Sequence, residues 1–241
     1  DALKFFTMSG KNRRWMISSK LCMFNLLVNP ERKYIWCETE PLTTQENINA
    51  ASEILSSFKN LDEVETMLLT AELFIAHNNE DAIKNAMKIF YQIIDIEQHN
   101  IPALVGLARC HLRLGNVKAT NVFIDKVFFF KPFHENYSYF EECYLMRASI
   151  ISEEQDYRSS QQFIYLALDL NLSSKKGWEM SGFVHMQNKM YSEAALAFSR
   201  CWKLGDKKDK QIGYNYAYCS LMGNRPDQAL VICRKLLDDN P

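Results

Sequence analysis

The sequence predicts an all-α fold in which antiparallel helix pairs stack into a solenoid, a right-handed superhelix. The chain of 241 residues contains only 8 Gly and 6 Pro. Few stretches alternate between apolar and polar residues, and apolar residues recur instead at three- and four-residue spacing from Trp15 to Leu237. Hydrophobic residues make up 47% of the chain and charged residues 24%, which is a composition that can build a packed core.

The helices follow a repeat with a period of about 34 residues. The clearest copy covers residues 175–208, where Trp178, Gly182, Ala194 and Phe198 stand at the offsets of the tetratricopeptide pattern. In that pattern, two helices touch closely where the facing residues are small, and large residues fill the space where the helices diverge. We therefore interpret the chain as a tetratricopeptide solenoid.

The repeat pattern divides the chain into consecutive helix pairs that form a single solenoid segment over residues 1–241. Residues 1–9 are interpreted as a partial repeat, and residues 12–59 as a repeat interrupted by an insertion at 29–43. The further repeats are predicted at 62–100, 101–134, 141–174, 175–208 and 210–241. Because the sequence starts at Asp1 without a Met start, we expect it to be a piece of a longer chain.

Nine residues are predicted to pack the repeats together. They occupy either the small position or one of the large apolar positions of the pattern: Leu107, Ala108, Ala148, Trp178, Gly182, Ala194, Phe198, Ala217 and Ala229.

Several classes of function lack support in the sequence. A formal net charge of -1 argues against nucleic-acid binding, and no apolar run is long enough for insertion into a membrane. The seven cysteines and five histidines are scattered without ligand spacing, which predicts neither a metal nor a cofactor. No catalytic residue can be assigned, so we expect the protein not to be an enzyme.

The first helix of each pair should line the concave inner wall of the solenoid. The wall is predicted to include Val105, Leu112 and Leu221, and its candidate partner-binding residues are Met146, Met180, Phe183, Met186, Tyr214, Tyr218 and Met222. Met and Tyr suit burial of an apolar partner segment, whereas the Lys, Arg and Asn of a carboxylate clamp are largely missing. Packing within the protein is an equally good interpretation of the same residues.

A second concentration of aromatic residues surrounds the place where extra residues interrupt the repeat. It is either a docking patch or a local core that seals an irregular junction, and the second interpretation is the commoner outcome. It consists of Phe123, Phe128, Phe129, Phe130, Phe133, Tyr137, Tyr139 and Phe140.

Beyond the generic repeat, parts of the sequence resemble the tetratricopeptide repeat protein 21 family. The similar stretches are HNIPALVGLA at 99–108, WEMSGF at 178–183, YSEAAL at 191–196, Trp202-Lys203 and Gly213-Tyr214. The resemblance covers nearly the whole chain and corresponds to the C-terminal part of that family, although the stretch 31–42 departs from it.

The resemblance implies a structural scaffold subunit of intraflagellar transport complex A. Such a subunit supports cilium assembly and retrograde ciliary transport, contacts the other complex A subunits, and is found in the cilium or flagellum and in the cytoplasm at the ciliary base. The alternative, which rests on the repeat alone, is a generic cytosolic tetratricopeptide adaptor that binds short peptide segments of partner proteins.

Overall fold

The computed structural model describes residues 2–9, 15–38, 40–58, 61–205 and 209–238. In these residues the chain forms helices and no strand, so the prediction of an all-α fold is confirmed. None of the described helices has the length and apolar character needed to cross a membrane. Contacts within the chain separate two compact units, Asp1–Phe129 and Phe130–Pro241.

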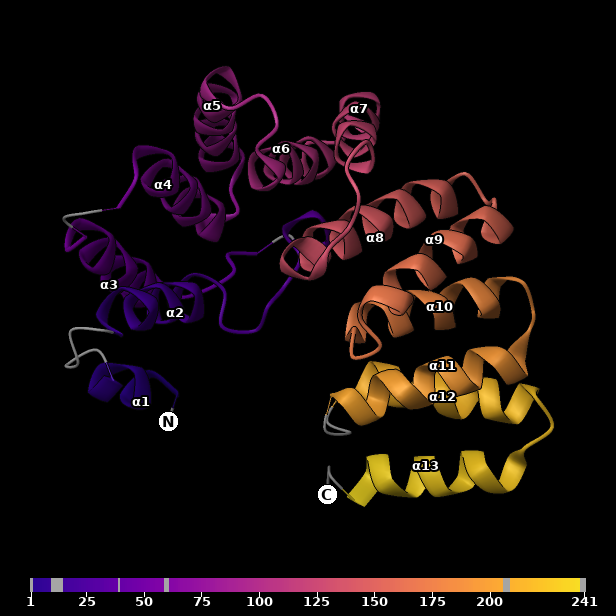
Figure 1. The fold of residues 1–241 in the computed structure, drawn as a ribbon. Coiled ribbons are helices and arrows are strands. Elements are labelled where there is room, and N and C mark those ends of the chain that lie inside the picture. The colour runs from indigo at the N-terminus through magenta and orange to yellow at the C-terminus, as the bar shows by residue number, and fades with distance from the viewer. Residues whose placement is uncertain (1, 10–14, 39, 59–60, 206–208, 239–241) are drawn as a thin grey trace. The chain divides into compact units, whose positions relative to one another are not determined.

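Unit 1 begins with a short helix and continues with helix pairs (Figure 1). Its elements are α1 (Ala2–Ser9), α2 (Met16–Val28), the 3-10 turn η1 (Ile35–Cys37), α3 (Gln45–Ser56), α4 (Glu63–His77), α5 (Glu80–Ile96), α6 (Ile101–Arg113) and α7 (Val117–Phe128). The predicted insertion at 29–43 corresponds to the link between α2 and α3, which contains η1.

Unit 2 consists of the 3-10 turn η2 and three consecutive helix pairs. They are η2 (His134–Asn136), α8 (Tyr137–Glu153), α9 (Tyr157–Leu170), α10 (Lys175–Gln187), α11 (Tyr191–Leu204), α12 (Lys210–Met222) and α13 (Pro226–Asp238). The sequence was interpreted as a single solenoid segment, and the contacts group its helices into two units whose boundary, between Phe129 and Phe130, lies shortly before η2.

Short polar side chains start most of the helices. In α5, α6, α7, α9, α10 and α12 the residue before the helix accepts a hydrogen bond from a backbone N–H of the first turn; these residues are Asn79, Asn100, Asn116, Asp156, Ser174 and Asp209. Each such bond satisfies a donor that the helix itself leaves unpaired. The caps therefore fix where one helix of the stack stops and the next begins.

The turns inside the helix pairs share one backbone feature. Gly115, Gln155, Lys189 and Asn224 stand at the same offset from the start of the predicted repeats 101–134, 141–174, 175–208 and 210–241, and all four have a positive φ, between 58° and 75°. A left-handed residue reverses the chain directly after a helix, so the same turn recurs along the stack.

The packing residues of the repeat lie where large and small side chains meet. Eight of the nine are buried, and Trp178 is half-buried. Its ring nitrogen donates to the carbonyl of Leu172 at 2.8 Å, and the Arg200 guanidinium lies 4.4 Å from its ring. At Gly182, a Cβ atom would stand only 2.7 Å from the ring of the buried Phe198, so α10 and α11 approach closely because this residue is a glycine.

Candidate partner-binding surface

Helix α12 presents apolar side chains on the side that faces away from the core of unit 2. Tyr214 is 61% exposed, Tyr218 40%, Leu221 55% and Met222 46%. Residues three and four apart lie on the same side of a helix, so these four form one continuous surface, which we call the α12 face. An exposed patch of this kind marks a candidate interaction site.

The opposite side of α12 anchors it in the core. Ile212, Tyr216 and Cys219 are buried in a cluster with residues of α11 and α13, and the rings of Tyr216 and Trp202 meet at 5.9 Å. A Cβ atom on Gly213 would stand 2.7 Å from Leu236 of α13. Helices α11 and α13 therefore both pack closely against α12, and this fixes the orientation of the α12 face.

A neighbouring ring also orients the α12 face. Tyr191, the first residue of α11, packs edge to face against Tyr218, with ring centroids 6.3 Å apart and an interplanar angle of 83°. Aromatic side chains that are already oriented lose little entropy on binding and are common anchors of protein interfaces.

The three candidate residues of α10 are half-buried and serve the core as well as the surface. Phe183 and Met186 pack against the cluster that contains Phe198, and the rings of Phe183 and Phe198 meet at 5.3 Å and 86°. Met180 packs against a second cluster, which is centred on Ala148 and Ile164. These side chains offer less accessible area than the α12 face.

Met146 corrects the prediction of the wall. Its side chain in α8 is fully buried, at 0% exposure, so it cannot contact a partner in this conformation. Phe140, Cys143, Leu145 and Ala148 of the same helix are buried as well. Helix α8 is buried on more than one side. The position of a residue within the repeat therefore does not predict whether its side chain in α8 is accessible.

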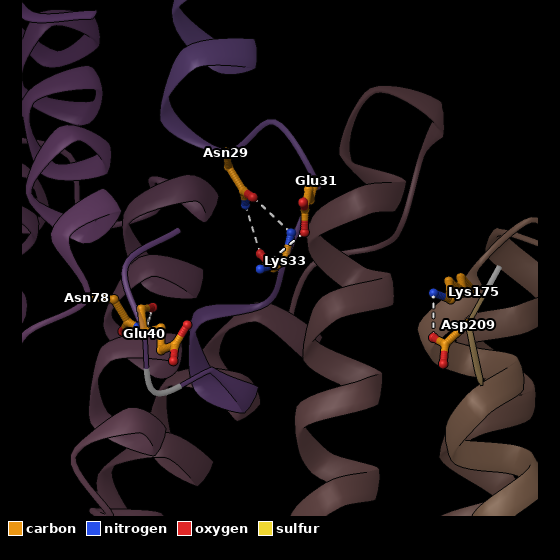
Figure 2. Close-up of polar contacts among 7 residues, drawn as sticks. All are labelled: Asn29, Glu31, Lys33, Glu40, Asn78, Lys175 and Asp209. Atoms are coloured by element: carbon orange, nitrogen blue, oxygen red, sulfur yellow. Dashed lines mark hydrogen bonds and ion pairs between the residues drawn. The ribbon is translucent and has the colours of Figure 1, made fainter. Parts of the chain in front are cut away.

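The lysines at the start of α10 are engaged in ion pairs. Lys175 Nζ lies 3.0 Å from Asp209 Oδ2, as Figure 2 shows, and Lys176 Nζ lies 3.0 Å from Glu179 Oε2. Burial acts to lower the pKa of Lys175, but the hydrogen bond and the negative charge of Asp209 outweigh it and raise this pKa. Ion pairing with Asp209 therefore occupies the Lys175 ammonium, which weakens the case for a carboxylate clamp here.

Cys201, Cys219 and His185 of unit 2 are buried, whereas Cys233 of α13 is exposed. Burial raises the pKa of the Cys201 thiol to about 12 and that of Cys219 to about 11, which suppresses the nucleophilic thiolate. His185 is buried, and burial lowers its pKa. In the described part of the chain, no group of three or more His, Cys, Asp or Glu residues could hold a metal ion.

Two groups of exposed apolar residues were missed or left open by the sequence reasoning. Leu230, Val231 and Leu237 of α13 are at least half exposed, and the signal for them was that α13 carries apolar residues on more than one side. In the aromatic concentration, Phe123 and Phe140 are buried whereas Phe129 and Phe133 are exposed. Phe123 and Phe140 therefore cannot belong to a docking patch in this conformation, and docking through Phe129 and Phe133 stays a prediction.

Comparison with known proteins identifies similar sequences over the whole chain. Residues 50–241 match the model of the tetratricopeptide repeat protein 21 C-terminal ARM domain. The chain is 21% identical to human tetratricopeptide repeat protein 21B over 257 aligned positions, covering 100% of this chain and 20% of that protein. It is 24% identical to the Caenorhabditis elegans tetratricopeptide repeat protein 21 homolog, with 100% and 19% covered. The chain thus spans about a fifth of the length of these relatives.

Solved structures of similar fold are tetratricopeptide proteins or resemble them. MamA has a TM-score of 0.56 and 12% identity, covering 74% of this chain and 95% of that one. YrrB, described as a TPR protein with an unusual peptide-binding site, has a TM-score of 0.54 and 14% identity, with 80% and 92% covered. At such identities the likeness concerns the fold, and the predicted tetratricopeptide-type fold is confirmed.

Proposed function

Because this chain belongs to the tetratricopeptide repeat protein 21 family, we propose that it is a scaffold segment that holds partner proteins and that the α12 face is one of its holding surfaces. The observation that carries the proposal is the exposure of Tyr214, Tyr218, Leu221 and Met222 on one side of a helix that is packed on its other side. A rigid apolar surface gains free energy by burial against a partner without first having to become ordered.

We further propose that the partners are the other subunits of intraflagellar transport complex A. The resemblance to the family supports this. On the same ground we propose that the protein works in cilium assembly and retrograde ciliary transport, in the cilium and at its cytoplasmic base. The apolar character of the α12 face suits an assembled complex, because apolar surfaces are covered in stable interfaces. The role is structural, with no chemical step assigned to any residue.

Co-purification of complex A subunits with the full-length protein tests this proposal. In the test variant, Tyr214→Asp, Tyr218→Asp and Met222→Asp place charges on the α12 face. The control, Leu166→Asp with Leu196→Asp, changes residues that are 44% and 57% exposed on α9 and α11. We expect the test variant to bind complex A subunits with at least about tenfold lower affinity, since interface anchors contribute about 2 kcal/mol or more to the free energy of binding.

The control variant should bind as the wild type does, and circular dichroism should show both variants folded. If the folded test variant retained every complex A subunit at the wild-type level, the α12 face would not be a holding surface. If instead the wild type bound none of these subunits but captured one linear motif from a peptide array with micromolar affinity, the protein would be a peptide adaptor.

A further inference from the structure

Helix α6 of unit 1 is covered on every side. All six residues from Ala103 to Ala108 are buried, and six consecutive residues of an α-helix point in all directions around its axis. Helices α5 and α7 pack against two sides of α6, and η1 lies against it as well. Val105, which was predicted on the accessible inner wall, is 0% exposed, whereas Tyr214 and Tyr218 of the corresponding helix in unit 2 are exposed.

The stretch between α2 and α3 contributes two apolar anchors to unit 1. We call residues 33–38 and 40–43 the inner segment. Ile35 is 2% exposed and Leu42 is 4% exposed, and the backbone N–H of Leu42 donates to the carbonyl of Ala76 in α4 at 2.9 Å. Between these anchors, Cys37, Glu40 and Pro41 are exposed.

Asn78 binds the backbone of the inner segment. It ends α4 in a left-handed conformation with a φ of 46°, and its side-chain amide donates to the carbonyls of Glu38 at 3.0 Å and Glu40 at 2.8 Å. Its Oδ1 accepts a hydrogen bond from Arg113 Nε of α6 at 3.3 Å. Figure 2 shows Asn78 beside Glu40. One buried amide therefore joins α4 and α6 to the backbone of the inner segment.

The turn at residues 29–33, which leads into the inner segment, is held by contacts among its own residues. Asn29 donates to the carbonyl of Lys33 and accepts from its backbone N–H, both at 2.8 Å, and Glu31 pairs with Lys33 at 3.1 Å. These bonds, drawn in Figure 2, involve no residue of α4 or α6. The turn at 29–33 can therefore persist when the segment leaves those helices.

We propose that the inner face of unit 1, formed by α4 and α6, is a receptor for a short peptide segment and that the inner segment is its resident occupant. The ligand that fits has two apolar side chains at the same spacing along the chain as Ile35 and Leu42. Between them it has backbone carbonyls that can accept hydrogen bonds from the Asn78 amide.

The inner segment excludes a competing segment because it is covalently attached. A tethered ligand is present at an effective concentration of the order of mM, so a partner segment of similar affinity cannot displace it at ordinary concentrations. This proposal concerns a surface and a competition that are independent of the α12 face.

A peptide-complementation experiment tests the proposal. In the release variant of the chain, Ile35→Ser and Leu42→Ser remove both anchors. The probe is a fluorescent synthetic peptide with the sequence of residues 31–44 and Ser in place of Cys37, and the control peptide carries Ser at both anchor positions. We expect the probe to bind the release variant at least about tenfold more tightly than the wild type, and the control peptide to bind neither.

Adding Asn78→Gly to the release variant should weaken binding of the probe severalfold, because glycine retains the left-handed backbone and lacks the amide. Circular dichroism checks that each variant is folded. Equal affinity of the probe for the wild type and the folded release variant, or no binding to either, would overturn the proposal.

Hydrogen exchange of the wild type gives a second test, which does not depend on the folding of a variant. If the inner segment leaves its face by local opening, the amide of Leu42, which donates to the carbonyl of Ala76, should exchange at least about tenfold faster than the amides of residues 104–108 in α6. Exchange of the Leu42 amide and the α6 amides at one common rate would mean that the segment opens only when unit 1 unfolds, and the proposal would be wrong.

Discussion

The contact between Gly182 and Phe198 shows how a single residue sets the distance between two helices. Gly182→Ala would place a methyl group 2.7 Å from the Phe198 ring, and that ring is fully buried and cannot move away. We expect the free energy of unfolding to fall by about 1–3 kcal/mol, as measured by urea denaturation. The control is Gly205→Ala, where the nearest atom, at 3.3 Å, belongs to the flexible end of Lys175; an equal loss there would contradict this explanation.

The left-handed turn residues predict a substitution that stabilises the protein. Lys189 has a φ of 59°, a conformation that costs a residue with a side chain about 1–2 kcal/mol and costs glycine little. Lys189→Gly should therefore raise the free energy of unfolding by up to about 1 kcal/mol, because the greater freedom of glycine in the unfolded chain offsets part of the gain. Gly115→Ala, at a φ of 75°, should lower it by a similar amount, and a loss of stability in both variants would show that φ does not decide the effect.

Single residues also mark how far sequence reasoning reached. Trp178, Gly182, Ala194 and Phe198 could be assigned to their positions because the repeat pattern requires a size of side chain at each one. Accessibility is different, since it depends on which neighbour covers a helix. Met146 is buried although the repeat offset placed it on the wall, and the pairing of Lys175 with Asp209 required knowledge of how α10 and α12 meet.

At the scale of helices, two stacked pairs contain the same Tyr-His contact. Tyr91 Oη lies 2.9 Å from His111 Nε2 between α5 and α6, and Tyr165 Oη lies 3.5 Å from His185 Nε2 between α9 and α10. The ring of His111 also stacks on Phe123, with centroids 5.5 Å apart. Burial lowers the pKa of both histidines below the ordinary value of 6.5, so both favour the neutral form in the folded protein.

These lowered pKa values predict a loss of stability in mild acid. Below pH 6.5 the unfolded chain takes up protons on His111 and His185 that the folded chain does not, so the free energy of unfolding falls with pH until the folded pKa values are reached. Urea denaturation between pH 7.5 and pH 5 should show this fall, and the variant with His111→Gln and His185→Gln should show less of it. An unchanged pH dependence in that folded variant would contradict the assignment.

The link between α2 and α3 shows what the sequence could not predict about an element. An insertion at 29–43 followed from Pro30, Pro41 and the broken helical spacing. Its position against α6 did not follow, because the hydrogen bonds from Asn78 and the burial of Ile35 and Leu42 involve residues far apart in the sequence. Local sequence propensity predicts where such a segment begins and ends in the chain. The helices against which it packs are determined by tertiary contacts.

At the scale of the whole molecule, each compact unit contains its own core. Unit 2 holds two clusters of buried residues, one around Phe198 and Trp202 and one around Ala148 and Ile164. In a repeat protein, stability arises mainly from contacts between neighbouring repeats. A fragment of residues 130–241 should therefore fold alone and unfold cooperatively in urea, which circular dichroism at 222 nm can measure; a fragment without helicity would contradict this division of the chain.

The fold of the whole molecule was the most predictable feature, because one pattern of small and large residues recurs along the chain. The division into two units was not predicted. The sequence shows extra residues at 135–140 between two repeats, but it is the distribution of contacts that separates the units, between Phe129 and Phe130.

The central claim, that the α12 face holds a partner protein, can be tested most directly by site-specific photo-cross-linking in cells. A benzophenone side chain would replace Tyr218 of the α12 face in one full-length variant and Leu196 of α11, which is 57% exposed, in another. Our account predicts a cross-link from position 218 to a complex A subunit and none from position 196. Cross-links from position 196 alone, or from neither position while the protein is assembled with complex A, would contradict it.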